Sequence, residues 1–78
     1  MTHRARLVIE NAHVSTIRLR IEPWADEYDV PAGARGTVHS FGPSQVDVLV
    51  QFEPGVVTVW ENSPDNSMSD VIIDPISN

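Results

Sequence analysis

Apolar and polar residues alternate along much of the 78-residue chain, in short segments separated by turn-forming residues. Alternation with a period of two is typical of strands that bury one face. In TIRLRIE, for example, residues 17, 19 and 21 are aliphatic, whereas residues 18, 20 and 22 are charged. Successive side chains of a strand point to opposite faces, so this segment predicts a strand with one face in the core and one in water.

Turn signals rich in Gly, Pro, Asn, Asp and Ser divide the chain into seven such segments. We predict strands at residues 5–10, 16–22, 24–30, 35–41, 45–52, 56–61 and 69–73. FEPGVV is the clearest hairpin, because Pro54 suits the first central position of a type II turn and Gly55 the second, where φ is positive. The fold class we predict is all-β, a small antiparallel β-sandwich or partly open barrel of about seven short strands.

Two further segments carry specific expectations. QVDVLVQF places residues 46, 48, 50 and 52 on one side, but Leu49 on the other side suggests cover on both faces and predicts a position near the centre of a sheet. NSPDNSMS is the most polar stretch and predicts a mobile surface loop, and residues 74–78 predict a flexible tail.

The totals fit a single domain spanning residues 1–78. There is no cysteine, so a disulfide or a thiolate metal site is excluded. The first residues contain only a three-residue apolar run before Glu10, too short for a signal peptide, and no segment has the apolar length of a membrane span. We therefore expect a cytoplasmic protein that does not bind membranes.

Charge is unevenly distributed along the chain, although the net charge is −6. Residues 1–20 carry four arginines against Glu10, whereas residues 21–78 carry ten acids against Arg35. Binding to phosphate backbones depends on Lys and Arg, so the acidic total disfavours nucleic acid as a partner. A basic face on an acidic body remains possible in this pattern.

The densest acidic run lies in IEPWADEYDVPAG, residues 21–33. Pro23 cannot sit in a central ladder and marks an edge, a bulge or a corner. If the chain stays extended after it, Trp24, Asp26 and Tyr28 share one side and Glu27 and Asp29 the other. Gly33 is free to adopt positive φ in the turn that follows.

Two interpretations of this stretch stay open. In one, Trp24 and Tyr28 form an exposed aromatic pair ringed by Asp26, Glu27 and Asp29, a composition suited to a basic protein partner. In the other, both rings are core and the acids form a solvated edge that resists aggregation. We favour the core for Trp24, because a domain with five aromatic residues needs them for burial.

The same stretch resembles a segment of small bacterial β-rich proteins in which I-E-P-W is followed by acids, a tyrosine, and a proline and glycine turn. The resemblance covers IEPWADEYDVPAG, with the preceding ENAHVSTIRLR in a compatible place, about a third of the chain. It implies a β fold with this segment near a sheet corner, and it brings no activity.

Catalytic and metal chemistry find little support in the sequence. His3, His13 and His39 show no metal-ligand spacing, and DEYD lacks the spacing and glycine of a calcium loop. Met1-Thr2-His3 has the groups to wrap Cu(II) or Ni(II) in a square plane, an incidental property that removal of Met1 abolishes. No serine lies in an activating motif, and Ser40 and His39 point to opposite strand faces. We expect no enzyme activity, no cofactor and no metal.

Two hypotheses of function remain. The first is a non-enzymatic module that binds another protein or a second copy of itself through its acidic surface and edges, by analogy with inhibitor and immunity proteins, with Trp24, Asp26, Glu27, Tyr28 and Asp29 as the binding residues. The alternative is a small β-barrel that binds single-stranded nucleic acid through an arginine face made by Arg4, Arg6, Arg18 and Arg20.

Overall fold

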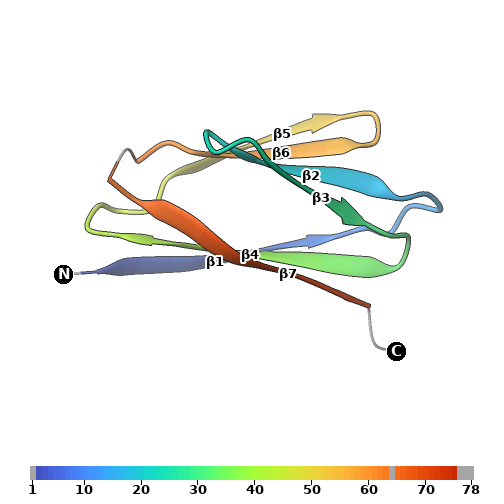
Figure 1. Ribbon diagram of the computed structural model, residues 1–78, viewed down its shortest axis with the longest axis horizontal. Coiled ribbons are helices and arrows are strands. Elements are labelled where there is room, and N and C mark those ends of the chain that lie inside the picture. The colour runs from blue at the N-terminus through green and yellow to red at the C-terminus, as the bar shows by residue number, and fades with distance from the viewer. Residues whose placement is uncertain (1, 64, 76–78) are drawn as a thin grey trace.

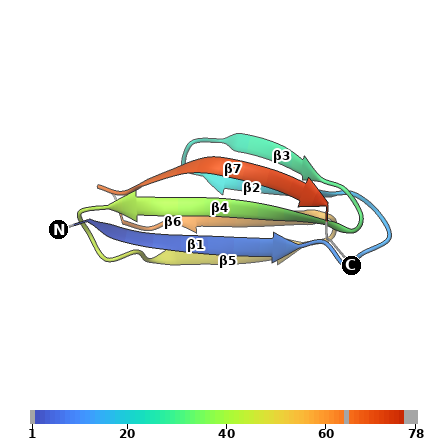
Figure 2. The ribbon, with the colours of Figure 1, turned by 90° about the horizontal axis from the view of Figure 1, so that it is seen from below.

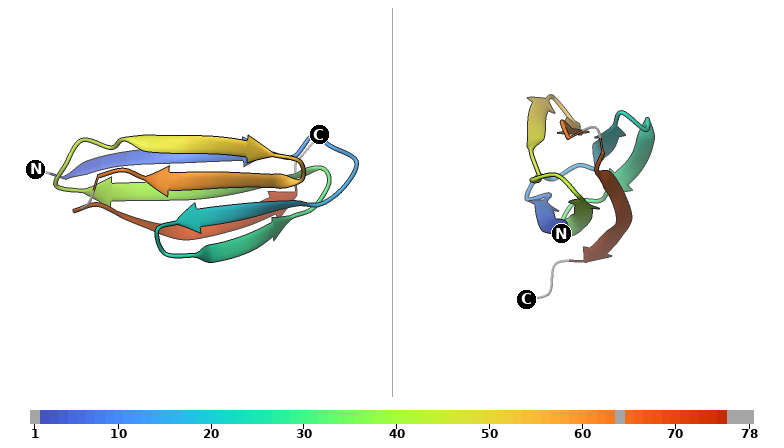
Figure 3. Two further views of the ribbon diagram at one scale, coloured as in Figure 1. Left: turned by 90° about the horizontal axis from the view of Figure 1, so that it is seen from above. Right: turned by 90° about the vertical axis from the view of Figure 1, so that its left-hand side faces the viewer.

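Two β-sheets face each other in a computed structural model that describes residues 2–63 and 65–75 (Figure 1). The three-stranded sheet has the order β1 (His3–Glu10), β4 (Ala34–Gly42), β7 (Ser67–Pro75), and its neighbours are antiparallel. The four-stranded sheet has the order β3 (Asp26–Val30), β2 (Ile17–Glu22), β6 (Val56–Glu61), β5 (Val48–Glu53). The end-on view in Figure 3 shows the two sheets as separate layers, so the predicted β-sandwich is confirmed.

All seven predicted strands are present, most within two residues of their predicted ends. The predicted hairpin β5–β6 is confirmed, and Gly55 has φ 76°. Gly33 also has positive φ, 75°, in the turn between β3 and β4. One pair departs from an antiparallel arrangement: β2 and β6 run parallel, because β2 enters the four-stranded sheet from the other sheet rather than through a hairpin with β6.

The core fills the space between the inner faces of the two sheets. Its buried members are small and branched aliphatic residues: Leu19, Ile21, Val30, Ala34, Val38, Val57 and Val59. In β2 the aliphatic residues point inward and the charged residues outward, as the alternation predicts. Burial of a Leu, Ile or Val side chain contributes about 1.5–3 kcal/mol, so these few residues make a large hydrophobic contribution to so small a domain.

The turn between β2 and β3 begins at Pro23, which follows a cis peptide bond. The chain reverses over residues 23–25, with Ala25 at φ 59°, and β3 starts at Asp26. The prediction that the chain stays extended through Trp24 is therefore wrong, because the reversal occurs before Trp24 can join a strand.

The predicted central position of the segment 45–52 is also wrong. Its strand, β5, is an edge of the four-stranded sheet, bonded only to β6 among the described strands. The apolar residue on the outer face, Leu49, is 47% exposed, and Phe52 on the inner side is 76% exposed. The apolar residues on both faces of β5 therefore belong to an exposed edge strand and not to a buried central strand.

Buried asparagines hold loops together at the two ends of the sandwich. At one end the Asn11 amide donates hydrogen bonds to the carbonyls of Ser15 (2.9 Å) and Val30 (2.8 Å). At the other end Asn66 donates to the Ser44 carbonyl (2.9 Å) and accepts from the Ser44 amide (3.1 Å). Each side chain thereby supplies the partners that a buried loop backbone requires.

These contacts correct two expectations for the C-terminal region. Within the polar stretch 62–69, Ser63 and Asn66 are buried and hydrogen-bonded, so this part is no open surface loop. The predicted tail 74–78 is partly wrong, because β7 continues through Pro75, and its remaining residues lie outside the described part of the chain.

Candidate interaction surfaces

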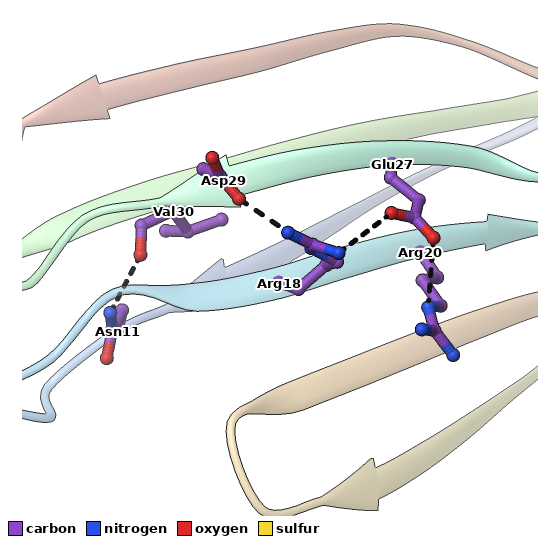
Figure 4. Close-up of polar contacts among 6 residues, drawn as sticks. All are labelled: Asn11, Arg18, Arg20, Glu27, Asp29 and Val30. Atoms are coloured by element: carbon purple, nitrogen blue, oxygen red, sulfur yellow. Dashed lines mark hydrogen bonds and ion pairs between the residues drawn. The ribbon is translucent and has the colours of Figure 1, made fainter.

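Glu27 and Asp29 of the acidic stretch form an ion-paired surface with two of the arginines on the outer face of the four-stranded sheet (Figure 4). The register sets Arg18 opposite Asp29 and Arg20 opposite Glu27. Glu27 contacts Arg18 Nη1 and Arg20 Nε, each at 3.2 Å, and Arg18 Nε lies 3.8 Å from Asp29 Oδ1. The Arg20 Nε contact lacks hydrogen-bond geometry, so it is an ion pair only. These charges largely neutralise one another. Neither the acids nor the two arginines are therefore as available to a charged binding partner as the sequence suggests.

The five residues predicted to bind a partner do not share one surface. Glu27 and Asp29 point outward to the arginines, whereas Tyr28 is half-buried and packs against the core. Trp24 is 41% exposed in the β2–β3 turn, and Asp26 is exposed at the start of β3. The core interpretation is therefore confirmed for Tyr28 and wrong for Trp24, and the exposed aromatic pair ringed by acids does not form.

The four arginines of the predicted basic face are also divided. Arg18 and Arg20 share the outer face of the four-stranded sheet, as predicted, but Arg4 and Arg6 lie on β1 in the other sheet. Register places Phe41 beside Arg4 and His39 beside Arg6 on the outer face of β4. The sequence alone does not predict this neighbourhood, because the residues are more than thirty positions apart and meet only through strand pairing.

The sandwich has four edge strands, and three of them carry features that discourage pairing with another strand. Charged side chains line β1 and β3, and β7 has an irregular register and ends at Pro75. Natural proteins protect edge strands by these means. The fourth edge, β5, reads Val-Leu-Val-Gln-Phe from Val48 to Phe52, with no charge, proline or glycine before its last residue, Glu53. It is the least protected edge among the described residues.

The hydrogen bonds of β5 show which backbone groups face solvent. The Asn62 amide donates to the Asp47 carbonyl at 2.9 Å, just before β5 begins. Bonded and non-bonded positions alternate along an antiparallel strand, so Leu49, Gln51 and Glu53 bond to β6 like Asp47. The backbone N–H and C=O groups of Val48, Val50 and Phe52 then point toward the open edge.

The outer face beside this edge carries an apolar pair, Leu49 and Trp60. Leu49 is paired with Trp60 of β6, which is half-buried, and the Trp60 indole donates a hydrogen bond to Gln51 Oε1 at 2.6 Å. Figures 2 and 3 show that β5 and β1 lie along the same side of the sandwich, and a small pocket of about 100 Å³ opens there between Leu7 and Val48.

Ser40 and Glu61 form a buried polar pair in the interior. Glu61 is 8% exposed, and its carboxylate accepts hydrogen bonds from the Ser40 hydroxyl and from the Ser63 amide (2.9 Å). His39 lies on the opposite face of β4, as the strand alternation predicts. Both Glu61 oxygens are engaged with loop and strand groups, which assigns the pair a structural role.

Among residues 2–63 and 65–75, no group of three His, Asp or Glu side chains gathers in a way that would hold a metal ion. The described part of the chain also has no helix long and apolar enough to cross a membrane. Comparison of the chain with protein-family models, curated proteins and solved structures gave no match.

Proposed function

We propose that this protein is a non-enzymatic binding module that associates with another protein, or with a second copy of itself, through the edge strand β5. The observation that carries the proposal is the contrast between β5, which carries no charge from Val48 to Phe52, and the three protected edges. An exposed strand with free backbone groups is a template for an additional strand, whose main-chain hydrogen bonds supply affinity.

The side chains around β5 favour the same use. Leu49, Phe52 and Trp60 provide apolar area at the strand, and half-buried Trp60 is of the type that dominates binding energy at interfaces. The ion-paired acids of β3, in contrast, would have to lose Arg18 and Arg20 before they could bind a basic partner. We therefore place the binding surface at β5 instead of at residues 24–29.

A proline at Val50 tests the proposal. The Val50 amide faces the open edge, so Val50→Pro removes an edge donor without breaking the ladder to β6, and Val50→Ala is the matched control that keeps the amide. Immobilised wild type and Val50→Ala should retain a specific protein, either a tagged second copy or a partner, and Val50→Pro should not. Circular dichroism verifies that all three are folded. The proposal would be overturned if wild type, Val50→Ala and Val50→Pro retained the same proteins in the same amounts and all three were monomeric.

A second function, binding of single-stranded nucleic acid, is favoured by one observation only. Arg4 and the 39% exposed Phe41 are neighbours on the outer face of β1 and β4, and a cation beside an aromatic ring is how such proteins hold backbone and base. It predicts oligonucleotide binding that weakens with salt and is lost in Arg4→Ala and Phe41→Ala. Absence of binding at low salt would exclude it.

A further inference from the structure

The residue order of β5 is also complementary to that of a second, antiparallel β5. We propose that β5 pairs antiparallel with β5 of a second copy, about a two-fold axis at Leu49, so that the two four-stranded sheets become one. The inference rests on the proposed function, and names its partner and register.

The backbone restricts which registers are possible. Val48, Val50 and Phe52 carry the free edge groups, so these even-numbered residues must face even-numbered residues of the second copy. A two-fold axis then passes through Leu49, Val50 or Gln51. These three arrangements differ by one residue in the position of the axis and by two residues in strand register.

Charge distinguishes between the first two registers. With the axis at Val50, Asp47 lies directly opposite Glu53 of the second copy, and this pair of like charges occurs twice. With the axis at Leu49, Asp47 faces Gln51 and Glu53 faces Gln45. Every carboxylate then meets an amide, which can donate a hydrogen bond to it.

Apolar matching favours Leu49 over Gln51 as the centre. Leu49 then faces Leu49 of the second copy, with Trp60 beside each, giving a continuous apolar strip across the axis. On the inner side Phe52, 76% exposed in the single chain, meets Val46 of the second copy. An axis at Gln51 would set Leu49 opposite Glu53 and leave this strip unformed.

The pairing closes upon itself. Each chain uses the one edge that lacks protection against pairing among its described strands, so assembly stops at two copies, as expected of a two-fold interface. Because each copy carries a net charge of −6, long-range repulsion opposes the pairing and salt should strengthen it. A basic partner would show the reverse salt dependence.

A single cysteine on each strand position tests both partner and register, because the chain has no cysteine of its own. With the axis at Leu49, the two cysteines of Leu49→Cys chains form a non-hydrogen-bonded pair whose Cα atoms lie about 4.5 Å apart, within the roughly 4.4–6.8 Å that a disulfide spans. Two Gln51→Cys chains are offset by four residues, about 13 Å along the strand, which is too far. Gln51→Cys is therefore the matched control.

Under mild oxidation Leu49→Cys should form a disulfide-linked dimer, whereas Gln51→Cys should form none. Sedimentation of the wild type should show a non-covalent dimer whose affinity increases with salt. A disulfide through position 51 only, or through neither position in a wild-type dimer, would overturn the register. A wild type that stays monomeric at all concentrations and salts would overturn self-pairing. A monomeric wild type would not by itself exclude binding of another protein at β5. The Val50→Pro capture experiment tests that binding and so distinguishes failure of self-pairing from failure of the proposed function.

Discussion

Replacement of Asn11 by alanine should destabilise the domain far more than its position in a loop suggests. Asn11 is 2% exposed, and its side chain makes three hydrogen bonds: two to the carbonyls of Ser15 and Val30, and one from the His13 amide at 2.9 Å. These bonds tie the β1–β2 connection to the end of β3. Alanine removes all three and leaves the Val30 carbonyl buried without this donor.

The magnitude follows from the hydrogen bonds. At about 0.5–1.5 kcal/mol each, three bonds give a loss of about 1.5–4.5 kcal/mol in the free energy of unfolding. A domain of this length has about 4–12 kcal/mol in total, so the variant loses a large share of its stability. The melting temperature should fall by about 6–36 °C, since 1 kcal/mol corresponds to about 4–8 °C in a domain of this size.

Thermal and urea unfolding followed by circular dichroism measure this loss, and Asn62→Ala is the matched control. Asn62 is exposed, and its bond to Asp47 uses the backbone amide, so its replacement should change stability by less than about 0.5 kcal/mol. An Asn11→Ala variant as stable as Asn62→Ala would refute the assignment of stability to these three bonds.

Asn11→Asp sharpens the test because it keeps the size of the side chain. Its carboxylate would face the carbonyls of Ser15 and Val30, with which it cannot form hydrogen bonds when ionised. Burial raises the pKa of such a group in the folded protein above about 3.9, its unfolded value, so the destabilisation should grow as pH rises from that value and shrink in acid. A pH-independent difference from wild type would contradict the reasoning.

Three other changes give direct expectations from the contacts. Gly42→Ala should destabilise strongly, because a Cβ there would lie 2.6 Å from the Asn66 Cα, and unfolding by urea measures it. Ser40→Ala removes a donor to the buried Glu61 carboxylate and should cost about 1–3 kcal/mol in the same assay. Glu27→Gln, in contrast, should change stability by less than about 1 kcal/mol, because its ion pairs are exposed, and a larger loss would show that they are not screened.

Local signals were enough to predict the strands. Alternation with a period of two assigns faces within one strand, and Pro54 with Gly55 specifies the β5–β6 hairpin, because both depend only on neighbours in sequence. For the same reason the inward and outward residues of β2 agree with the structure. The sequence by itself therefore determines the fold class and most of the element boundaries.

The position of each strand in its sheet is not a local property. Leu49 has the same alternation whether β5 is central or at an edge, and the tertiary structure leaves it 47% exposed at the edge. The parallel pairing of β2 with β6 joins segments almost forty residues apart and has no signature in either segment. Trp24 is exposed because a turn removes it from the strand that would have buried it.

The candidate surfaces depend on the same non-local information. Sequence composition predicted acids and arginines as separate binding surfaces, but the β2–β3 register brings Glu27 against Arg18 and Arg20, and the division into two sheets separates Arg4 from both. The free edge at β5 exists because no described strand other than β6 forms backbone hydrogen bonds with it. Local alternation and turn chemistry thus determined what the strands are, whereas packing of distant segments decided which of their surfaces remain available to a partner.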